Sequence, residues 1–289
     1  MTKKKADACK KCHGKRYVLT NVKGKVQGSF CKCFVCDECG GEGRIYAENE
    51  KGISYVKDCA CATLEKSLKK LGNVGIPGKY AGSWLETYHP DEGTQKLALR
   101  KAKDFVKDFG ESNKGLVFMG KPGVGKTHLA VSIIKTLSME KGVDCKFIDF
   151  FQLLSDIRNG FSAGESEQAL INPFVKSRLL VIDELAKGRN TEWELTILDQ
   201  IISERYNDAD KVTIFTTNYP NENPDEKKGN SREGPGGKYV DTGSEEHRHN
   251  IWGEETLREK VGARIYSRLA EVCQFIKMEG KDFRQEINA

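Results

Sequence analysis

Short apolar runs alternate with segments of helical periodicity along most of the chain after residue 96. Apolar runs without polar alternation predict strands that are buried on both faces. Such runs occur at 116–119, at 179–182 and at 212–218, where the strand ends in a polar residue, and two mixed apolar segments at 145–150 and 272–277 also predict strands. Apolar residues spaced three and four apart predict helices at 97–109, 128–134, 151–157 and 259–269. The run at 179–182 is typical of a strand inside a parallel sheet.

The first 62 residues follow a different pattern, with few large apolar residues and two short stretches of strand-forming residues. These stretches are Tyr17-Val18-Leu19 and Arg44-Ile45-Tyr46, and each precedes a glycine that suits a turn, Gly24 or Gly52. We therefore expect two hairpins in a small domain at 1–62.

A linker is expected at 63–96, between this small domain and a larger one at 97–289. The linker begins with a short amphipathic basic helix at 63–71, which Gly72 ends. Residues 75–88, which we call the joint, are expected to be extended and to carry aromatic anchors. Within the larger domain, residues 221–251 hold almost no apolar side chain and predict a flexible insert.

Eight of the ten cysteines lie before residue 62 and form a tandem repeat, each unit with a Cys-x-x-Cys pair and a later Cys-x-Cys pair. Thiolate pairs that a hairpin brings together are typical ligands of tetrahedral Zn²⁺. The two units look like two zinc ribbons, so we predict a tandem zinc-ribbon-like domain at 1–62 with two structural zinc ions per chain. The preferred ligand sets are Cys9, Cys12, Cys31 and Cys33 on one ion, and Cys36, Cys39, Cys59 and Cys61 on the other. A crossed pairing, disulfides and a ligand role for His13 are the alternatives.

A glycine-rich segment, Gly120-Lys121-Pro122-Gly123-Val124-Gly125-Lys126-Thr127, lies between the predicted strand at 116–119 and the predicted helix at 128–134. This order of strand, loop and helix predicts a P-loop that binds ATP. Backbone N–H groups of the loop and the helix N-terminus suit phosphate oxygens. Lys126 is expected to reach the β and γ phosphates, and Thr127 to ligate Mg²⁺.

Two carboxylates, Asp183 and Glu184, follow the strand at 179–182, about 55 residues after the P-loop. This placement predicts a Walker B motif, with Asp183 on the Mg²⁺ ion and Glu184 as the base that orients and polarises the attacking water. The predicted nucleotide-binding residues are Gly120, Pro122, Gly123, Val124, Gly125, Lys126, Thr127, His128 and Asp183.

Asn218 ends the next predicted strand and is our candidate for positioning the lytic water; the alternative is a turn-forming residue. Arg264 and Arg268 are four residues apart and therefore lie on one helix face. We predict that they include an arginine finger for an adjacent subunit, which requires self-association through the ATP site. The alternative is a pair of surface arginines, with Arg268 paired to Glu271.

Positive charge is concentrated at the amino-terminal end. Residues 1–80 hold 17 Lys and Arg against 8 Asp and Glu, and the remainder holds 30 against 34. This excess predicts a nucleic acid or an acidic protein face as partner, or no more than solubility. No stretch approaches the roughly 20 apolar residues that span a bilayer, and no apolar signal region follows the basic start. We expect a cytoplasmic protein without a membrane partner.

Residues 75–289 resemble the AAA+ helicase loaders of the DnaC and DnaI type, with the transposition ATPase IstB as a near relative. The matching motifs are Gly75-Ile76-Pro77 with Tyr80, the P-loop with its Lys-Thr-His-Leu string, Asp183-Glu184, Thr-Thr-Asn218, Arg264-x-x-x-Arg268-Leu and the closing Gly-Lys-Asp-Phe-Arg at 280–284. The resemblance implies an α/β AAA+ P-loop fold with a five-stranded parallel sheet between helices and no C-terminal lid. It also implies that Asn218 is sensor 1 and that Arg268, less so Arg264, is the finger.

By the same resemblance, the chain is expected to load a replicative hexameric helicase onto single-stranded DNA and to release it on ATP hydrolysis. Expected cofactors are ATP, Mg²⁺ and two Zn²⁺. Two alternatives stay open: an IstB-like transposition ATPase that acts on DNA, and a zinc-based nucleic-acid or protein adaptor in which the P-loop is a switch with negligible turnover.

Overall fold

The computed structural model describes residues 9–91, 93–188, 191–221 and 255–283. The predicted insert at 221–251 lies outside the described residues except for its first residue. None of the helices in these ranges is long and apolar enough to cross a membrane.

Both predicted hairpins are confirmed at the amino-terminal end. Strands β1 (Tyr17–Val22) and β2 (Lys25–Phe30) pair antiparallel, as do β3 (Arg44–Glu48) and β4 (Ser54–Asp58). Lys23 and Gly24, between β1 and β2, have φ of 50° and 80°. Two consecutive positive φ angles suit a two-residue hairpin turn, whose twist matches that of the paired strands.

The basic helix after the hairpins is longer than expected. It is α2 (Ala60–Gly72), which begins three residues before the expected start at 63 and ends at Gly72 as expected. Its N-cap is Cys59, so the second Cys-x-Cys pair is folded into the helix start and Cys61 is buried. The joint that follows includes the short 3₁₀ helix η1 (Gly78–Tyr80).

A five-stranded parallel sheet forms the centre of the larger part of the molecule, as predicted. Its strands lie in the order β6-β7-β8-β5-β9, and all neighbouring pairs are parallel. Their bounds are β5 (Gly115–Met119), β6 (Cys145–Asp149), β7 (Leu179–Asp183), β8 (Val212–Thr217) and β9 (Cys273–Lys277).

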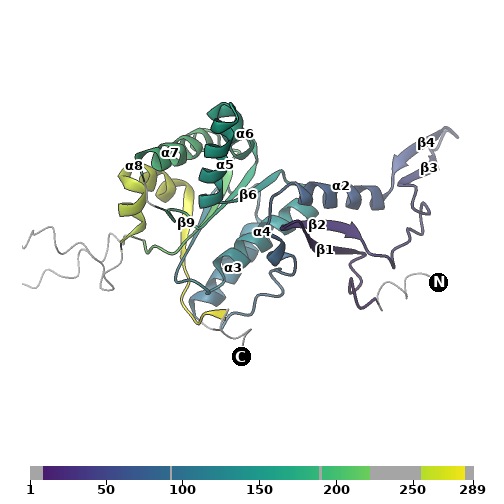
Figure 1. Cartoon of the computed structure of the whole chain (residues 1–289). Helices are drawn as coiled ribbons and strands as arrows, with labels where there is room; N and C mark the ends of the chain where they lie inside the picture. Colours follow the sequence, from purple (N-terminus) through teal and green to yellow (C-terminus); the bar gives the residue numbers. More distant parts are fainter. Residues whose placement is uncertain (1–8, 92, 189–190, 222–254, 284–289) are drawn as a thin grey trace, which may run out of the picture.

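Helices cover both faces of this sheet (Figure 1). Alternate residues of β5 face opposite layers, because Leu116 and Phe118 belong to one buried cluster and Val117 and Met119 to the other. The first layer contains α3 (Thr94–Lys107), which starts three residues before the expected 97, and α4 (Lys126–Glu140). The second layer contains α5 (Phe150–Ser162), α6 (Glu167–Lys176), α7 (Glu192–Tyr206) and α8 (Leu257–Val272).

The first hairpin is part of the core beside α4. Val26 of β2 is 1% exposed and belongs to the same buried cluster as Leu71 and Ile76. The backbone N–H of Val26 donates to the carbonyl of Ile76 at 2.8 Å. The apolar core therefore crosses the boundary that we expected at residue 62.

The second hairpin lies at the far end of α2, away from the sheet (Figure 1). Its buried cysteines form a separate small cluster, with Phe30, Phe34 and Ile45 packed against them. We call residues 9–33 the first repeat and residues 36–61 the second repeat. The two repeats share a cysteine pattern but differ in how they are attached.

Candidate nucleotide site and cysteine clusters

The predicted P-loop connects the end of β5 to the start of α4. Gly123 and Gly125 have φ of 86° and 94°, a left-handed conformation that favours glycine. A Cβ atom on Gly125 would lie 2.4 Å from the ring of Tyr88, so a larger residue does not fit there. Gly125 is also the N-cap of α4 and has no side chain to cap it, which leaves the first N–H groups of α4 available to an anion.

Lys126 lies against the backbone of this loop. Its Nζ donates to the carbonyl oxygens of Gly120 at 2.6 Å and Lys121 at 2.8 Å. The ammonium group is thereby held at the positive end of α4, where a P-loop places the phosphates of its nucleotide.

Thr127 and Asp183, the two predicted Mg²⁺ ligands, are in direct contact. The Thr127 hydroxyl donates to Asp183 Oδ1 at 2.8 Å. A hydroxyl and a carboxylate oxygen at this separation are the donor types that Mg²⁺ takes in proteins, so the residues fit the ion. Burial raises the pKa of Asp183, although hydrogen bonds from Thr216 and Thr127 oppose this shift.

Thr216 also belongs to this group, and our sequence analysis did not identify it. Its hydroxyl donates to Asp183 Oδ1 at 2.5 Å and accepts the backbone N–H of Glu184 at 3.0 Å. Thr216 therefore fixes both predicted carboxylate positions. In the sequence, Thr216 could have been found as a hydroxyl residue near the end of the buried strand expected beside the Asp183 strand, because a buried hydroxyl needs a hydrogen-bond partner.

Glu184 adopts a left-handed backbone conformation with φ of 54°, which is uncommon for a residue other than glycine. Its carboxylate forms an ion pair with Lys187. Burial alone would raise the pKa of Glu184, but the hydrogen bond and charge of Lys187 hold it below its ordinary value. The group is therefore ionised near neutral pH, as a base that orients water must be.

Asp149 is a third carboxylate at this edge that the sequence analysis did not assign. It ends β6, pairs in register with Asp183, and caps α5 by accepting the backbone N–H of Gln152 at 3.0 Å. Burial and the neighbouring Glu184 carboxylate raise its pKa. The sequence could have indicated Asp149, because it lies near the end of an apolar segment, as Asp183 does.

Asn218 is the first residue after β8, and its side chain is exposed. The strand-end contact with Asp183 comes from Thr216 instead. The role of Asn218 in positioning water therefore stays a prediction.

Arg264 and Arg268 both contact one carboxylate, Asp199 of α7. The nitrogen–oxygen distances are 3.3 Å from Arg264 and 3.4 Å from Arg268. The expected alternative pairing with Glu271 is absent, because Glu271 instead accepts the hydroxyl of Tyr206 at 2.9 Å. The arginine pair lies in the helix layer opposite α4, on a different face of the sheet from the P-loop helix.

A cavity of about 460 Å³ opens beside the P-loop. The residues that line it are Tyr80, Thr87, Tyr88, His89, Gly123, Gly125, Lys126, Thr127, His128 and Phe283. The Tyr88 hydroxyl donates to the carbonyl of Val124 at 3.0 Å, which fixes this ring against the loop. Aromatic walls next to a phosphate-binding loop suit a nucleotide base.

His128 is held in this cavity by the joint. Its Nε2 hydrogen-bonds the carbonyl of Trp84 at 2.9 Å, and burial lowers its pKa. The closing segment also contacts the loop, because the N–H of Phe283 donates to the carbonyl of Gly123 at 3.2 Å. A Cβ atom on Gly123 would lie 1.8 Å from Asp282 Oδ1, so this close approach requires glycine.

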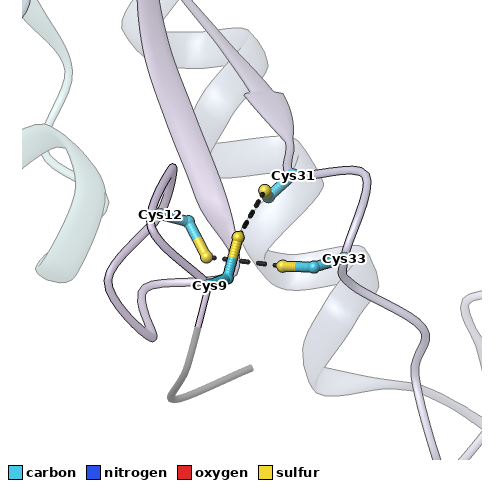
Figure 2. A group of neighbouring side chains, drawn as sticks. All are labelled: Cys9, Cys12, Cys31 and Cys33. Carbon is cyan, nitrogen blue, oxygen red and sulfur yellow. Dashed lines mark hydrogen bonds between the residues drawn. The ribbon is translucent and has the colours of Figure 1, made fainter. Parts of the chain in front are cut away.

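The eight amino-terminal cysteines gather into two groups of four, and each group contains the residues that we assigned to one ion. They are Cys9, Cys12, Cys31 and Cys33 in one group and Cys36, Cys39, Cys59 and Cys61 in the other, with the sulfur atoms of each group within 4.8 Å of one another. Figure 2 shows the first group converging from two loops. All eight are free thiols, without disulfides.

Sulfur separations in both groups suit a tetrahedral zinc ion. The distances are 3.7 Å for Cys9–Cys31, 3.4 Å for Cys12–Cys33, 3.5 Å for Cys36–Cys59 and 3.3 Å for Cys39–Cys61. Four sulfurs at about 2.3 Å from zinc lie about 3.8 Å apart, whereas a disulfide brings two sulfurs to about 2.05 Å.

Backbone N–H groups favour the thiolate form at one cysteine of each group. Hydrogen bonds from Cys12 and Lys11 lower the pKa of Cys9 to about 6. At Cys39 burial opposes the shift, but hydrogen bonds from Cys61 and from the N–H groups of Gly41 and Gly43 lower the pKa to about 6. Hydrogen bonds from the neighbouring thiols raise the pKa of Cys33, and burial together with such bonds raises that of Cys61. The fit to zinc therefore rests on the four converging sulfur atoms of each group.

Comparison with known proteins matches this chain to a family of ATP-binding proteins and to replicative helicase loaders. The family described as IstB-like ATP binding protein matches residues 88–230. The replicative helicase loader DnaC of Escherichia coli (strain K12) is 30% identical over 169 residues, which cover 57% of this chain and 68% of DnaC. The uncharacterized protein YqaM of Bacillus subtilis (strain 168) is 27% identical over 164 residues, which cover 53% of this chain and 51% of YqaM.

A solved structure agrees with the sequence matches. The crystal structure of the DnaC helicase loader aligns with a TM-score of 0.55 and 29% identity, and the alignment covers 70% of this chain and 99% of that one. The chain thus spans nearly the whole of a solved relative but about half the length of YqaM.

Proposed function

This chain belongs to the DnaC family of replicative helicase loaders, and we propose that it uses ATP to deliver a hexameric replicative helicase onto single-stranded DNA. Hydrolysis would then release the helicase. The observation that carries the ATP-dependent part is the hydrogen bond between Thr127 and Asp183, because it joins the P-loop to the carboxylate edge of the sheet.

In this proposal the P-loop residues bind the nucleotide, Asp183 serves the metal ion, and Glu184 acts on the lytic water. Lys126 and the N–H groups at the start of α4 hold the phosphates, and Tyr88 and His128 border the base. Thr127 and Asp183 would hold Mg²⁺, which when bound would neutralise phosphate charge. Glu184 orients and polarises the attacking water, with Asn218 as a second polar group at the same edge.

Two ion pairs must open before hydrolysis in this scheme. One is the pair of Glu184 with Lys187, and the other is the pair of Arg268 with Asp199 of its own chain. Arg264 contacts the same Asp199. A neighbouring subunit that offers a nucleotide phosphate competes with Asp199 for Arg268. Self-association would therefore complete each ATP site, which makes hydrolysis depend on assembly.

The second repeat is the part of the chain that we assign to the helicase contact. Tyr46 and Val56 are paired across β3 and β4 and are 75% and 53% exposed. Adjacent exposed apolar side chains are typical of protein contact sites. Figure 1 shows the β3–β4 hairpin beyond the amino-terminal end of α2, away from the five-stranded sheet.

The substitution Glu184→Gln tests the proposal, because it keeps the size of the side chain and removes its basicity. We expect ATP binding to persist, turnover to fall at least about 100-fold, and the purified host helicase to stay bound in ATP. The matched control is Glu165→Gln, an exposed carboxylate remote from the P-loop in sequence, which should release helicase like the wild type. If the wild-type chain does not retain the helicase under ATP, the loader proposal is wrong.

A transposition ATPase is the second candidate, because the family that matches residues 88–230 is described as IstB-like. This function predicts ATP-dependent filaments on duplex DNA and no affinity for the helicase. Electron microscopy of the same Glu184→Gln preparation on duplex DNA distinguishes the two. A pure adaptor would show no change on Glu184→Gln.

A further inference from the structure

The two cysteine repeats share a scaffold but carry opposite charge. The first repeat, residues 9–33, contains seven Lys and Arg residues and no Asp or Glu. The second, residues 36–61, contains three Lys and Arg residues against six Asp and Glu. The basic character that composition assigns to the amino-terminal end therefore belongs to one repeat only.

All seven cations of the first repeat are exposed: Lys10, Lys11, Lys15, Arg16, Lys23, Lys25 and Lys32. Within the described ranges, no carboxylate forms a salt bridge with any of them. Lys10 and Lys11 lie between Cys9 and Cys12, and Lys32 lies between Cys31 and Cys33. Because the sulfurs of these cysteines are within 4.8 Å of one another, the three lysines surround a single cluster.

We propose that the first repeat binds the phosphate backbone of a DNA strand, at a site separate from the P-loop, with Lys10, Lys11 and Lys32 as its centre. Exposed cations that form no salt bridge with any described carboxylate suit a sequence-independent contact with phosphates. The simpler explanation is that the lysines balance the charge of a zinc–thiolate cluster. The second repeat argues against it, because the same four-cysteine cluster there is surrounded by acidic residues.

The site has a fixed position relative to the ATP pocket. Val26 anchors β2 in the core, and Lys15 Nζ lies 4.6 Å from the ring centre of Trp84. The carbonyl of Trp84 hydrogen-bonds His128, which lines the nucleotide cavity. Within the first repeat, Lys15 is therefore linked through Trp84 to His128 at the start of the P-loop helix.

This inference goes beyond the proposed function, which assigns no surface to DNA, and rests on it only in taking a DNA strand as the ligand. The test uses the full chain and a fluorescent 25-nucleotide oligo-dT, with affinity measured by anisotropy at several salt concentrations. The variant is Lys10→Gln/Lys11→Gln/Lys32→Gln. The matched control removes three exposed cations from the second repeat, Arg44→Gln/Lys51→Gln/Lys57→Gln.

We expect the first variant to bind oligo-dT about 10- to 100-fold more weakly at 0.1 M salt, and the slope of log affinity against log salt to become shallower by about 2. The control should change affinity at most about twofold. Unchanged zinc content and circular dichroism show that both variants are folded. Equal losses in both variants, or a variant that matches the wild type, would overturn the proposal.

Helicase retention and ATP turnover, measured on the same preparations, separate this inference from the proposed function. If the wild-type chain retains helicase and hydrolyses ATP but does not bind oligo-dT, the first-repeat site is wrong and the loader function stands. If the wild-type chain binds oligo-dT through Lys10, Lys11 and Lys32 but retains no helicase, the loader function is wrong and the site stands.

Discussion

Lys135 is a fully buried lysine on α4, and its contacts explain how the interior tolerates it. Its Nζ donates to the carbonyl oxygens of Tyr80 at 2.9 Å and Ala81 at 3.0 Å, and lies 4.2 Å from the ring centre of Trp84. Burial, and then the nearby charge of Lys15, lower its pKa to about 7. A neutral amine keeps two N–H donors, which suffice for both carbonyls. The joint is thus fastened to α4 by a lysine that need not be charged.

Stability should therefore depend on pH through this residue. Between pH 7 and the ordinary lysine pKa of about 10.4, the unfolded chain binds more protons at this site than the folded chain, so the free energy of unfolding rises with pH. Between pH 7 and 9 the contribution is about 2 kcal/mol. We expect Lys135→Met to remove this part of the rise in urea titrations. Lys141→Met, at the exposed end of the same helix, should leave the rise intact; equal slopes for Lys135→Met and the wild type would contradict the assignment.

Among the elements, the two hairpins show that one sequence pattern can be used in two ways. β1 and β2 are fastened to the joint by backbone hydrogen bonds, since Gly78 N–H donates to the carbonyl of Gly24 and Val26 N–H to that of Ile76, both at 2.8 Å. Ile45 of β3 packs against the second cysteine cluster, and Asp58 of β4 forms an exposed ion pair with Lys66 of α2. The first hairpin is therefore part of the core, and the second depends on its own cysteines.

Truncation of one valine in each hairpin tests this difference. Val26→Ala removes buried methyl groups from the main core and should lower the free energy of unfolding of the sheet-containing part by about 1 to 3 kcal/mol. Val56→Ala, at a site that is 53% exposed, should change it by less than about 0.5 kcal/mol. Thermal unfolding of the two full-length variants makes the comparison. An unchanged transition for Val26→Ala would mean that the first hairpin is an independent module.

At the scale of the whole molecule, the P-loop and the arginine pair are on different faces of the sheet. α4 follows the P-loop in one layer, and α8 carries Arg264 and Arg268 in the other. A finger from α8 therefore suits the site of a neighbour, and the common contact with Asp199 keeps both arginines together.

Mixing two inactive variants tests action between subunits. Arg268→Ala keeps the P-loop and lacks the finger, whereas Lys126→Ala keeps the finger and lacks the phosphate contact. We expect a mixture to hydrolyse ATP at least about tenfold faster than either variant alone, because a finger contributes a factor of about 10³ or more. Arg264→Ala is the matched control and should retain most activity by itself. A mixture no faster than the sum of its components would exclude a finger in trans.

Features that the sequence determined by itself are those whose residues are close along the chain. The P-loop between a strand and a helix, the Asp183-Glu184 pair after an apolar run, and the spacing of the eight cysteines each place their chemistry within a few residues. Apolar segments likewise predicted all five strands. Burial on both faces leaves a continuous apolar run in the inner strands β5, β7 and β8, whereas the edge strands β6 and β9 keep polar residues at less buried positions. Helix starts were less predictable: α2 and α3 each begin three residues early.

Only the tertiary structure decided which distant residues meet. Thr216 rather than Asn218 contacts Asp183, because strand register, and not position at a strand end, chooses the neighbour. Asp199 holds both arginines because α7 and α8 pack together, and neither helix alone reveals this contact. Likewise, the cysteine pattern is the same in the first repeat, which packs into the main apolar core, and in the second repeat, which lies away from the sheet. That difference depends on whether an apolar side chain such as Val26 finds a partner surface, which is a property of packing.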